Sequence, residues 1–219
     1  MARPLNVLLI FTDQQRFDTI AALGNPIIRT PSLDRLAALG TAFTSAYSPC
    51  PVCVPARCSL HYGQYPANTH CYENNYDMPT DGRPSLQQSL HDAGYHTVAI
   101  GKRHFTPDPH AQRGFETLIT QAELAATVAQ DDYLTELHRA GYDDIREPHG
   151  VRGSMYYIPQ VSQLPVQWHP VQWIGDKTVG YIEQQKTASR PWMCFASFIH
   201  PHPPFAPPNP WHRLYSQSM

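Results

Sequence analysis

A short segment around Cys53 brings together residue types that can hold and attack an anion. Residues 49–63 read PCPVCVPARCSLHYG, with Cys53 followed by Pro55 and Arg57. Proline suits the first turn of a helix, where its missing N–H is no loss, so we predict a helix that starts near Pro55 or Ala56. The N–H groups at a helix N-terminus favour an anion, and the guanidinium of Arg57 matches sulfate or phosphate oxygens. The segment therefore predicts a reactive group beside an anion-binding site.

The cysteines of this segment are open to other interpretations. Cys50 and Cys53 form a C-x-x-C pair, which occurs in zinc sites and in thioredoxin-like redox sites. A structural zinc site needs a second ligand pair, and no second C-x-x-C or H-x-x-x-H follows at a suitable spacing. The chain has five cysteines, an odd number that argues against a disulfide framework. Buried thiols are the expectation for Cys58, Cys71 and Cys194.

Three apolar runs are each followed by charged or polar residues. Residues 6–12 precede Asp13 and Gln14, residues 95–100 precede Lys102 and His104, and residues 192–199 precede His200 and His202. Continuous apolar runs are typical of parallel strands buried on both faces, and ligands bind at the carboxyl ends of such strands. Asp13 is therefore a candidate ligand for a hard cation, with a helix N-cap as the alternative.

Helices must connect these strands, and the patterns predict where they lie. Helical spacing of apolar residues or a polar, helix-rich composition marks residues 30–40, 85–93, 121–138 and 173–185. Residues 43–47 predict a short strand, and Asp131 and Asp132 predict a solvated pair. Residues 141–171 are rich in proline and aromatic residues, which predicts a long irregular excursion. The chain is therefore predicted to be an α/β protein with a mostly parallel sheet.

The bulk properties exclude several classes of protein. A chain of 219 residues is long enough for one domain with a real core, and a net charge of −2 suggests no nucleic-acid partner. The longest apolar run, residues 7–11, is too short to span a membrane and lacks the cleavage site of a secretory signal. We therefore expect no membrane association and a cytoplasmic location. A homo-oligomer stays an open alternative.

The motifs together resemble the type I sulfatases of the alkaline phosphatase superfamily. The shared motifs are C-x-P-x-R with a following glycine (Cys53 to Gly63), G-Y-x-T-x-x-x-G-K-x-H (residues 94–104) and P-H-x-P-F (residues 201–205). Residues 6–13 also resemble the opening of many bacterial members. The departures from the usual residues are Gln14, where many members have a second aspartate, and Val54, His61-Tyr62 and Arg103. The resemblance covers the whole chain, but only the N-terminal part of the family's catalytic domain.

The resemblance implies a hydrolase whose cysteine is oxidised to formylglycine, an aldehyde that is hydrated at rest. One hydroxyl of the hydrate would attack the sulfur of a sulfate ester, and the second would lose its proton when the aldehyde re-forms. The resemblance assigns Cys53 as nucleophile, Arg57 and Lys102 as stabilising cations, His104 as base, and His202 as proton donor to the leaving oxygen. It assigns substrate contacts to Asn75, Lys102 and His202. The metal ligands that it implies are Asp13, Gln14 and Cys53.

The resemblance also implies cofactors, partners and two alternatives. The expected metal is Ca²⁺, the expected substrate is a small sulfate ester, and a formylglycine-generating enzyme is a transient partner. Gln14 keeps open a phosphonate monoester or phosphodiester hydrolase that uses Mn²⁺ or Zn²⁺. Resembling enzymes are longer, and their later half supplies further metal ligands and a lysine. An inactive, truncated fragment that lacks these ligands is therefore the other alternative. For every one of these functions, the resemblance implies that residues 1–219 form an alkaline-phosphatase-like, mostly parallel sheet with helices on both faces, incomplete at the C-terminus.

Overall fold

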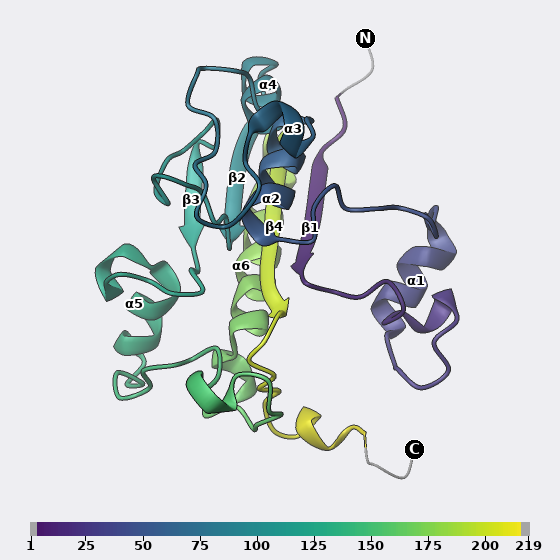
Figure 1. Ribbon diagram of the computed structural model, residues 1–219, viewed down its shortest axis with the longest axis vertical. Helices are drawn as coiled ribbons and strands as arrows, with labels where there is room; N and C mark the ends of the chain where they lie inside the picture. Colours follow the sequence, from purple (N-terminus) through teal and green to yellow (C-terminus); the bar gives the residue numbers. More distant parts are fainter. Residues whose placement is uncertain (1–3, 216–219) are drawn as a thin grey trace.

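The computed structural model describes residues 4–215, which are arranged around a four-stranded sheet (Figure 1). Its strands are β1 (Val7–Asp13), β2 (His96–Gly101), β3 (Thr117–Thr120) and β4 (Trp192–Pro201). They lie in the order β1-β4-β2-β3, and each neighbouring pair is parallel. All carboxyl ends therefore lie at the same end of the sheet, as the sequence predicted.

Helices and short 3-10 turns connect the strands. The helices are α1 (Pro31–Leu39), α2 (Cys53–Tyr62), α3 (Pro66–Thr69), α4 (Leu86–Asp92), α5 (Asp132–Arg139) and α6 (Pro170–Gln184). The 3-10 turns are η1 (Ala21–Leu23), η2 (Val128–Gln130), η3 (Gly153–Met155), η4 (Val166–Trp168), η5 (Gln185–Thr187) and η6 (Trp211–Arg213). None of the helices within residues 4–215 combines the length with the hydrophobicity that a membrane span requires.

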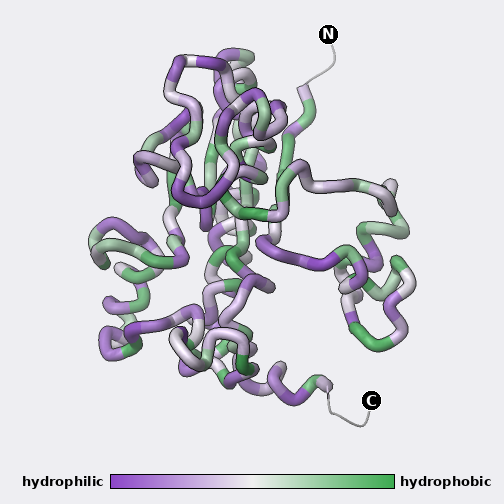
Figure 2. Tube along the Cα trace, viewed as in Figure 1, coloured by the Kyte–Doolittle hydropathy of each residue, from purple (hydrophilic) through white to green (hydrophobic). Residues whose placement is uncertain are grey.

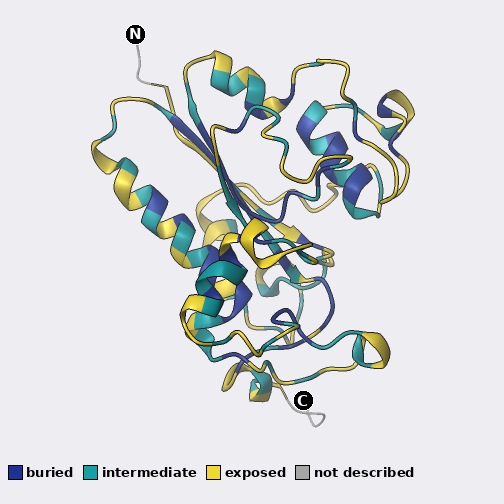
Figure 3. Cartoon of the chain, turned by 90° about the vertical axis from the view of Figure 1, so that its left-hand side faces the viewer, coloured by how far each residue is buried: buried dark blue, intermediate teal, exposed yellow. Residues whose placement is uncertain are grey.

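Helices cover both faces of the sheet (Figure 3). Successive side chains of a strand point to opposite faces, so β2 and β4 contribute to two separate cores. Val98 and Cys194 pack on the side of α5 and α6, where Trp173 and Ile174 are buried. Ala99, by contrast, packs on the side of α2. The α/β prediction with helices on both faces is confirmed, and hydrophobic stretches run along the strands of the sheet (Figure 2).

The first strand is more exposed than its sequence predicted. Residues 6–12 predicted a strand buried on both faces, but β1 lies at an edge of the sheet, where only β4 pairs with it. Leu8 is 40% exposed and Ile10 is 52% exposed. The following segment with η1 and α1 extends away from the sheet (Figure 1), and α1 buries none of its side chains. An apolar run therefore identified the strand but not what covers it.

Two local predictions are wrong, and one helix start is shifted. Residues 43–47 form no strand, because no described strand lies alongside them, and Tyr47 is 90% exposed. Helix α2, predicted to start near Pro55 or Ala56, begins two residues earlier, at Cys53, and Pro55 lies in its first turn, where no N–H is required. Asp131 is buried rather than solvated, because its carboxylate accepts a hydrogen bond from the N–H of Leu134 and caps α5. Helices α1, α4 and α6 lie where they were predicted, whereas α5 occupies only the last part of the predicted range 121–138. Cys58, Cys71 and Cys194 are buried free thiols as predicted.

Candidate active site

The register of the sheet brings three strand ends to one level. Phe11 of β1 and Gly101 of β2 both pair with Ser197 of β4. Gly101 has a φ of +96°, and a Cβ built on it would lie 2.1 Å from the carbonyl oxygen of Ser197. Only glycine therefore lets β2 end this close to β4. The next residue, Lys102, consequently leaves the sheet beside Asp13 at the end of β1.

The buried guanidinium of Arg57 ties these three strand ends together. Its Nη2 donates a hydrogen bond to Oδ2 of Asp13 at 3.0 Å. Its Nη1 donates to the carbonyl oxygen of Lys102 at 2.7 Å and to Oγ of Ser197 at 2.9 Å. The guanidinium also lies over the ring of Phe11, 5.1 Å from its centroid. One side chain of α2 thus contacts the ends of β1, β2 and β4, and its exposed fraction is only 1%.

A chain of alternating charges continues from Arg57 into the cavity. The Lys102 ammonium lies 2.8 Å from Oδ2 of Asp13 and 2.7 Å from Oε2 of Glu123. Burial alone would raise the pKa of Asp13, but Lys102 and Arg57 lower it to about 2. Burial alone would also raise the pKa of Glu123, but Lys102 and Arg152 lower it to about 2. Both carboxyls are therefore ionised across the physiological pH range.

Cys53 is placed by the first turn of α2 and by a neighbouring loop. The N–H of Val54 donates to Oδ1 of Asn74 at 2.9 Å, so Asn74 satisfies a free donor at the start of the helix. The Cys53 sulfur lies 3.4 Å from Oδ1 of Asp13. Burial raises the pKa of the thiol, and Asp13 adds to this effect against the opposite influence of Lys102. The unmodified thiol is therefore a weakly ionised group in this position.

The two histidines at the site differ in their hydrogen bonding. Burial, followed by the charges of Lys102 and Arg57, lowers the pKa of His104 to about 4, so its imidazole is neutral near pH 7. The buried Nδ1 of His104 has no hydrogen-bond partner among the described residues. The Nδ1 of His202 lies 2.6 Å from the carbonyl oxygen of Pro203 and must carry the proton, since a carbonyl only accepts. That bond leaves Nε2 of His202 available for other partners.

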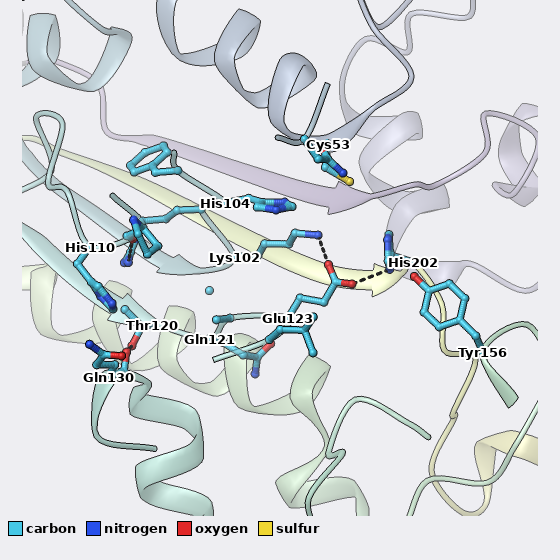
Figure 4. Close-up of a pocket in the computed structure, with 17 residues that line it drawn as sticks. Cys53, Lys102, His104, His110, Thr120, Gln121, Glu123, Gln130, Tyr156 and His202 are labelled. Carbon is cyan, nitrogen blue, oxygen red and sulfur yellow. Dashed lines mark hydrogen bonds and ion pairs between the residues drawn. The ribbon is translucent and has the colours of Figure 1, made fainter. Parts of the chain in front are cut away.

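His104 and His202 line a cavity of about 340 Å³ (Figure 4). Its lining includes Cys53, Lys102, His104, Glu123, Tyr156 and His202. A second cavity of about 600 Å³ is lined by Asp13, Gln14 and Arg57, and Cys53 lines both cavities. The polar edge of the sheet is therefore open on two sides of Cys53.

A group of potential metal ligands lies between the two cavities. The ligand atoms of Asp13, Cys53 and His202 all lie within 4.8 Å of one another. Gln14 adjoins Asp13 in the second cavity, in the left-handed region with a φ of +58°. The structure thus brings together the residues that the sequence singled out at positions 13, 14, 53, 57, 102, 104 and 202.

The loop after α3 presents Asn74 rather than Asn75 to the site. Asn75, the predicted substrate contact, is exposed and lines neither cavity, whereas its neighbour Asn74 lines the first one. Glu123 and Tyr156 were not predicted at all. Glu123 follows β3, whose four residues give no long apolar run. Tyr156 lies in the irregular excursion, where no pattern of the sequence marked it.

Comparison with known proteins agrees with this geometry. A model of the sulfatase family matches residues 5–218. The chain belongs to the sulfatase family. An arylsulfatase of Clostridium perfringens is 26% identical to this sulfatase chain over 96% of the chain and 46% of that protein. The "multifunctional alkaline phosphatase superfamily protein PehA" of Trinickia caryophylli is 28% identical over 96% of the chain and 44% of that protein.

The fold of this sulfatase chain also has solved counterparts. The phosphonate monoester hydrolase of Agrobacterium radiobacter superimposes with a TM-score of 0.77 at 24% identity. The superposition covers 99% of the chain and 45% of that structure. The chain therefore has the fold of this superfamily, and it spans less than half the length of the relatives it matches.

Proposed function

We propose that this protein hydrolyses sulfate esters with a formylglycine derived from Cys53. The observation that carries the proposal is the position of Cys53 at the start of α2, 3.4 Å from Asp13 and in one cavity with Lys102 and His202. The similarity to an arylsulfatase supports a sulfate ester as substrate. Because burial raises the pKa of the thiol, Cys53 is a poor nucleophile as it stands. The hydrated aldehyde would supply a hydroxyl nucleophile instead.

The other side chains have environments that suit the proposed roles. The Lys102 ammonium and the Arg57 guanidinium offset the negative charge of the ester near Cys53. His104 is neutral near pH 7, so it can accept the proton that is lost when the aldehyde re-forms. His202 presents Nε2, which in its protonated form would donate to the leaving oxygen.

A divalent metal ion belongs to this proposal. Asp13 would hold it, with Gln14 and the converted Cys53 as further ligands. Conversion replaces the sulfur of Cys53 by oxygen, so the donors become a carboxylate, an amide and hydroxyl oxygens, which suit Ca²⁺. When bound, the ion would offset the charge of the ester. A formylglycine-generating enzyme would act on Cys53 before the metal site is complete.

A second function is the hydrolysis of phosphonate monoesters or phosphodiesters, with Mn²⁺ or Zn²⁺ as the metal. Gln14 favours it, because a neutral amide beside Asp13 gives the metal one carboxylate where many sulfatases supply two. The similarity to a relative described as multifunctional also favours it. Parallel assays with aryl sulfate and aryl phosphonate esters on the full-length protein separate the two functions.

The decisive test is the mass of the peptide that contains Cys53. The full-length protein is expressed in a host that has the converting enzyme, and the peptide mass distinguishes a thiol from an aldehyde. We expect the aldehyde together with turnover of aryl sulfates, and Cys53→Ala should abolish the turnover. An unmodified thiol in that host would contradict both functions that depend on formylglycine.

A further inference from the structure

The carboxylate of Glu123 forms ion pairs with two cationic side chains at the cavity that also contains Cys53. Its Oε2 lies 2.7 Å from the Lys102 ammonium (Figure 4). Its Oε1 lies 2.9 Å from Nη2 of Arg152. Nδ1 of His202 lies 3.7 Å from Oε1 and donates to Pro203 instead. Both carboxylate oxygens of Glu123 are therefore used to hold charged side chains in place.

The backbone that carries Glu123 is itself fixed by two helices. The N–H of Ala122 donates to Oδ2 of Asp131 at 2.6 Å, and Asp131 caps α5 through the N–H of Leu134 at 2.9 Å. The side-chain amide of Gln121 donates to the carbonyl oxygen of Pro170, at the start of α6, at 3.2 Å. The carboxylate of Glu123 therefore extends from a segment that is anchored to the starts of α5 and α6, which limits how far Lys102 can move.

Arg152 connects Glu123 to the excursion of residues 141–171. Its backbone N–H donates to Oε1 of Glu147 at 3.0 Å, which holds Arg152 within its own loop. Its guanidinium lies over the ring of Tyr156, 5.4 Å from the centroid, and Tyr156 lines the cavity. Glu123 thus links the catalytic lysine of the proposed mechanism to the wall of the cavity.

The negative charge of Glu123 also affects which ligand charge the cavity favours. Arg57, Lys102 and Arg152 carry three positive charges along this chain of contacts, and Asp13 and Glu123 carry two negative charges, so these five side chains sum to one positive charge. Loss of the Glu123 charge would leave two positive charges and favour a doubly charged ligand.

We propose that Glu123 is a positioning residue that holds Lys102 toward the bound ester, and that its charge makes the cavity favour singly charged over doubly charged esters. The inference rests on the proposed function, since it assumes that an anionic ester binds beside Lys102. Sulfate monoesters, phosphonate monoesters and phosphodiesters carry one negative charge, whereas phosphate monoesters carry two above about pH 7.

The test measures binding separately from turnover. Phenyl sulfate and phenyl phosphate are titrated by calorimetry into the full-length Cys53→Ala protein with Ca²⁺, at about pH 8, where the phosphate has two charges. Glu123→Gln is expected to shift the ratio of the two dissociation constants toward phenyl phosphate about tenfold, equivalent to about 1.4 kcal/mol. In the converted enzyme, Glu123→Gln should also lower kcat/KM for phenyl sulfate by at least about tenfold, and Glu123→Asp should restore the ratio.

Two further variants keep the proposal open to refutation. Glu116→Gln is the matched control, because Glu116 precedes β3 at the opposite end of the strand and pairs with Arg190 at 2.7 Å. It should leave both the ratio and the turnover unchanged. If Glu123→Gln does not fold, Arg152→Gln must shift the ratio toward phenyl sulfate.

The two proposals fail in different ways. A ratio within twofold of the parent in a folded Glu123→Gln protein, or in Arg152→Gln, would overturn the inference about Glu123. If the Cys53→Ala protein binds phenyl sulfate but the converted enzyme with Cys53 does not hydrolyse it, the proposed function is refuted instead. If the Cys53→Ala protein binds neither phenyl sulfate nor phenyl phosphate, both proposals are refuted.

Discussion

Replacement of Arg57 by methionine tests whether one buried cation holds the strand ends together. Methionine keeps much of the side-chain volume but removes the guanidinium, which contacts Asp13, Lys102 and Ser197. The carboxylate of Asp13 would then stay buried with Lys102 as its remaining cation, at 2.8 Å. Because Arg57 helps to lower the pKa of Asp13 to about 2, this pKa should rise in the variant.

The contacts of Arg57 set the size of the effect. Removal of one partner from a buried ion pair costs about 3–5 kcal/mol, because the other charge stays buried without compensation. Lys102 still compensates Asp13, which favours the lower end of this range. The lost hydrogen bonds to Ser197 and to the carbonyl of Lys102 add to the cost, while apolar packing of methionine over Phe11 offsets part of it. We therefore expect a loss of about 3 kcal/mol, which is a fall in Tm of roughly 6–12 °C for a domain of this size.

Thermal and urea unfolding followed by circular dichroism measure this loss. The matched control is Arg83→Met, since Arg83 also pairs with an aspartate, Asp81, at 2.6 Å but lies in a partly exposed position. An exposed pair of this kind contributes little to stability, because solvent screens its charges. If Arg57→Met loses no more stability than Arg83→Met, then Arg57 does not hold the strand ends together.

Three further changes should alter stability in defined ways. Burial lowers the pKa of His149 and of His200 to about 3, so the stability that these two neutral histidines contribute is fully present above pH 6.5 and is lost as the pH falls toward 3. Each histidine should contribute a slope of about 1.4 kcal/mol per pH unit in that range, measurable as the urea midpoint against pH. Gly101→Ala should prevent stable folding, seen as loss of a cooperative thermal transition, because its Cβ would lie 2.1 Å from the Ser197 carbonyl oxygen. Asp131→Ala should cost about 1–2 kcal/mol in denaturant unfolding through loss of the α5 cap.

Much of the site could be predicted because its residues follow long apolar strands. Asp13, Lys102 and His202 each come after such a run, and parallel strands place their carboxyl ends at one edge. Arg57 was recognised from its spacing to Cys53. The contact between Arg57 and all three strand ends could not be predicted, because it depends on how α2 packs across the sheet.

Glu123 shows what local patterns miss. Strand β3 has only four residues, and none of them is fully buried, so no apolar run marks it. Its position follows instead from pairing, because Gly101 of β2 lies opposite Thr120 of β3. The segments that follow these two residues leave the sheet at the same level, which allows Lys102 and Glu123 to meet at 2.7 Å. Once β2 was recognised, a search for charged residues after each short strand that could pair with it would have found Glu123, since the pairing carries the information that the composition of β3 lacks.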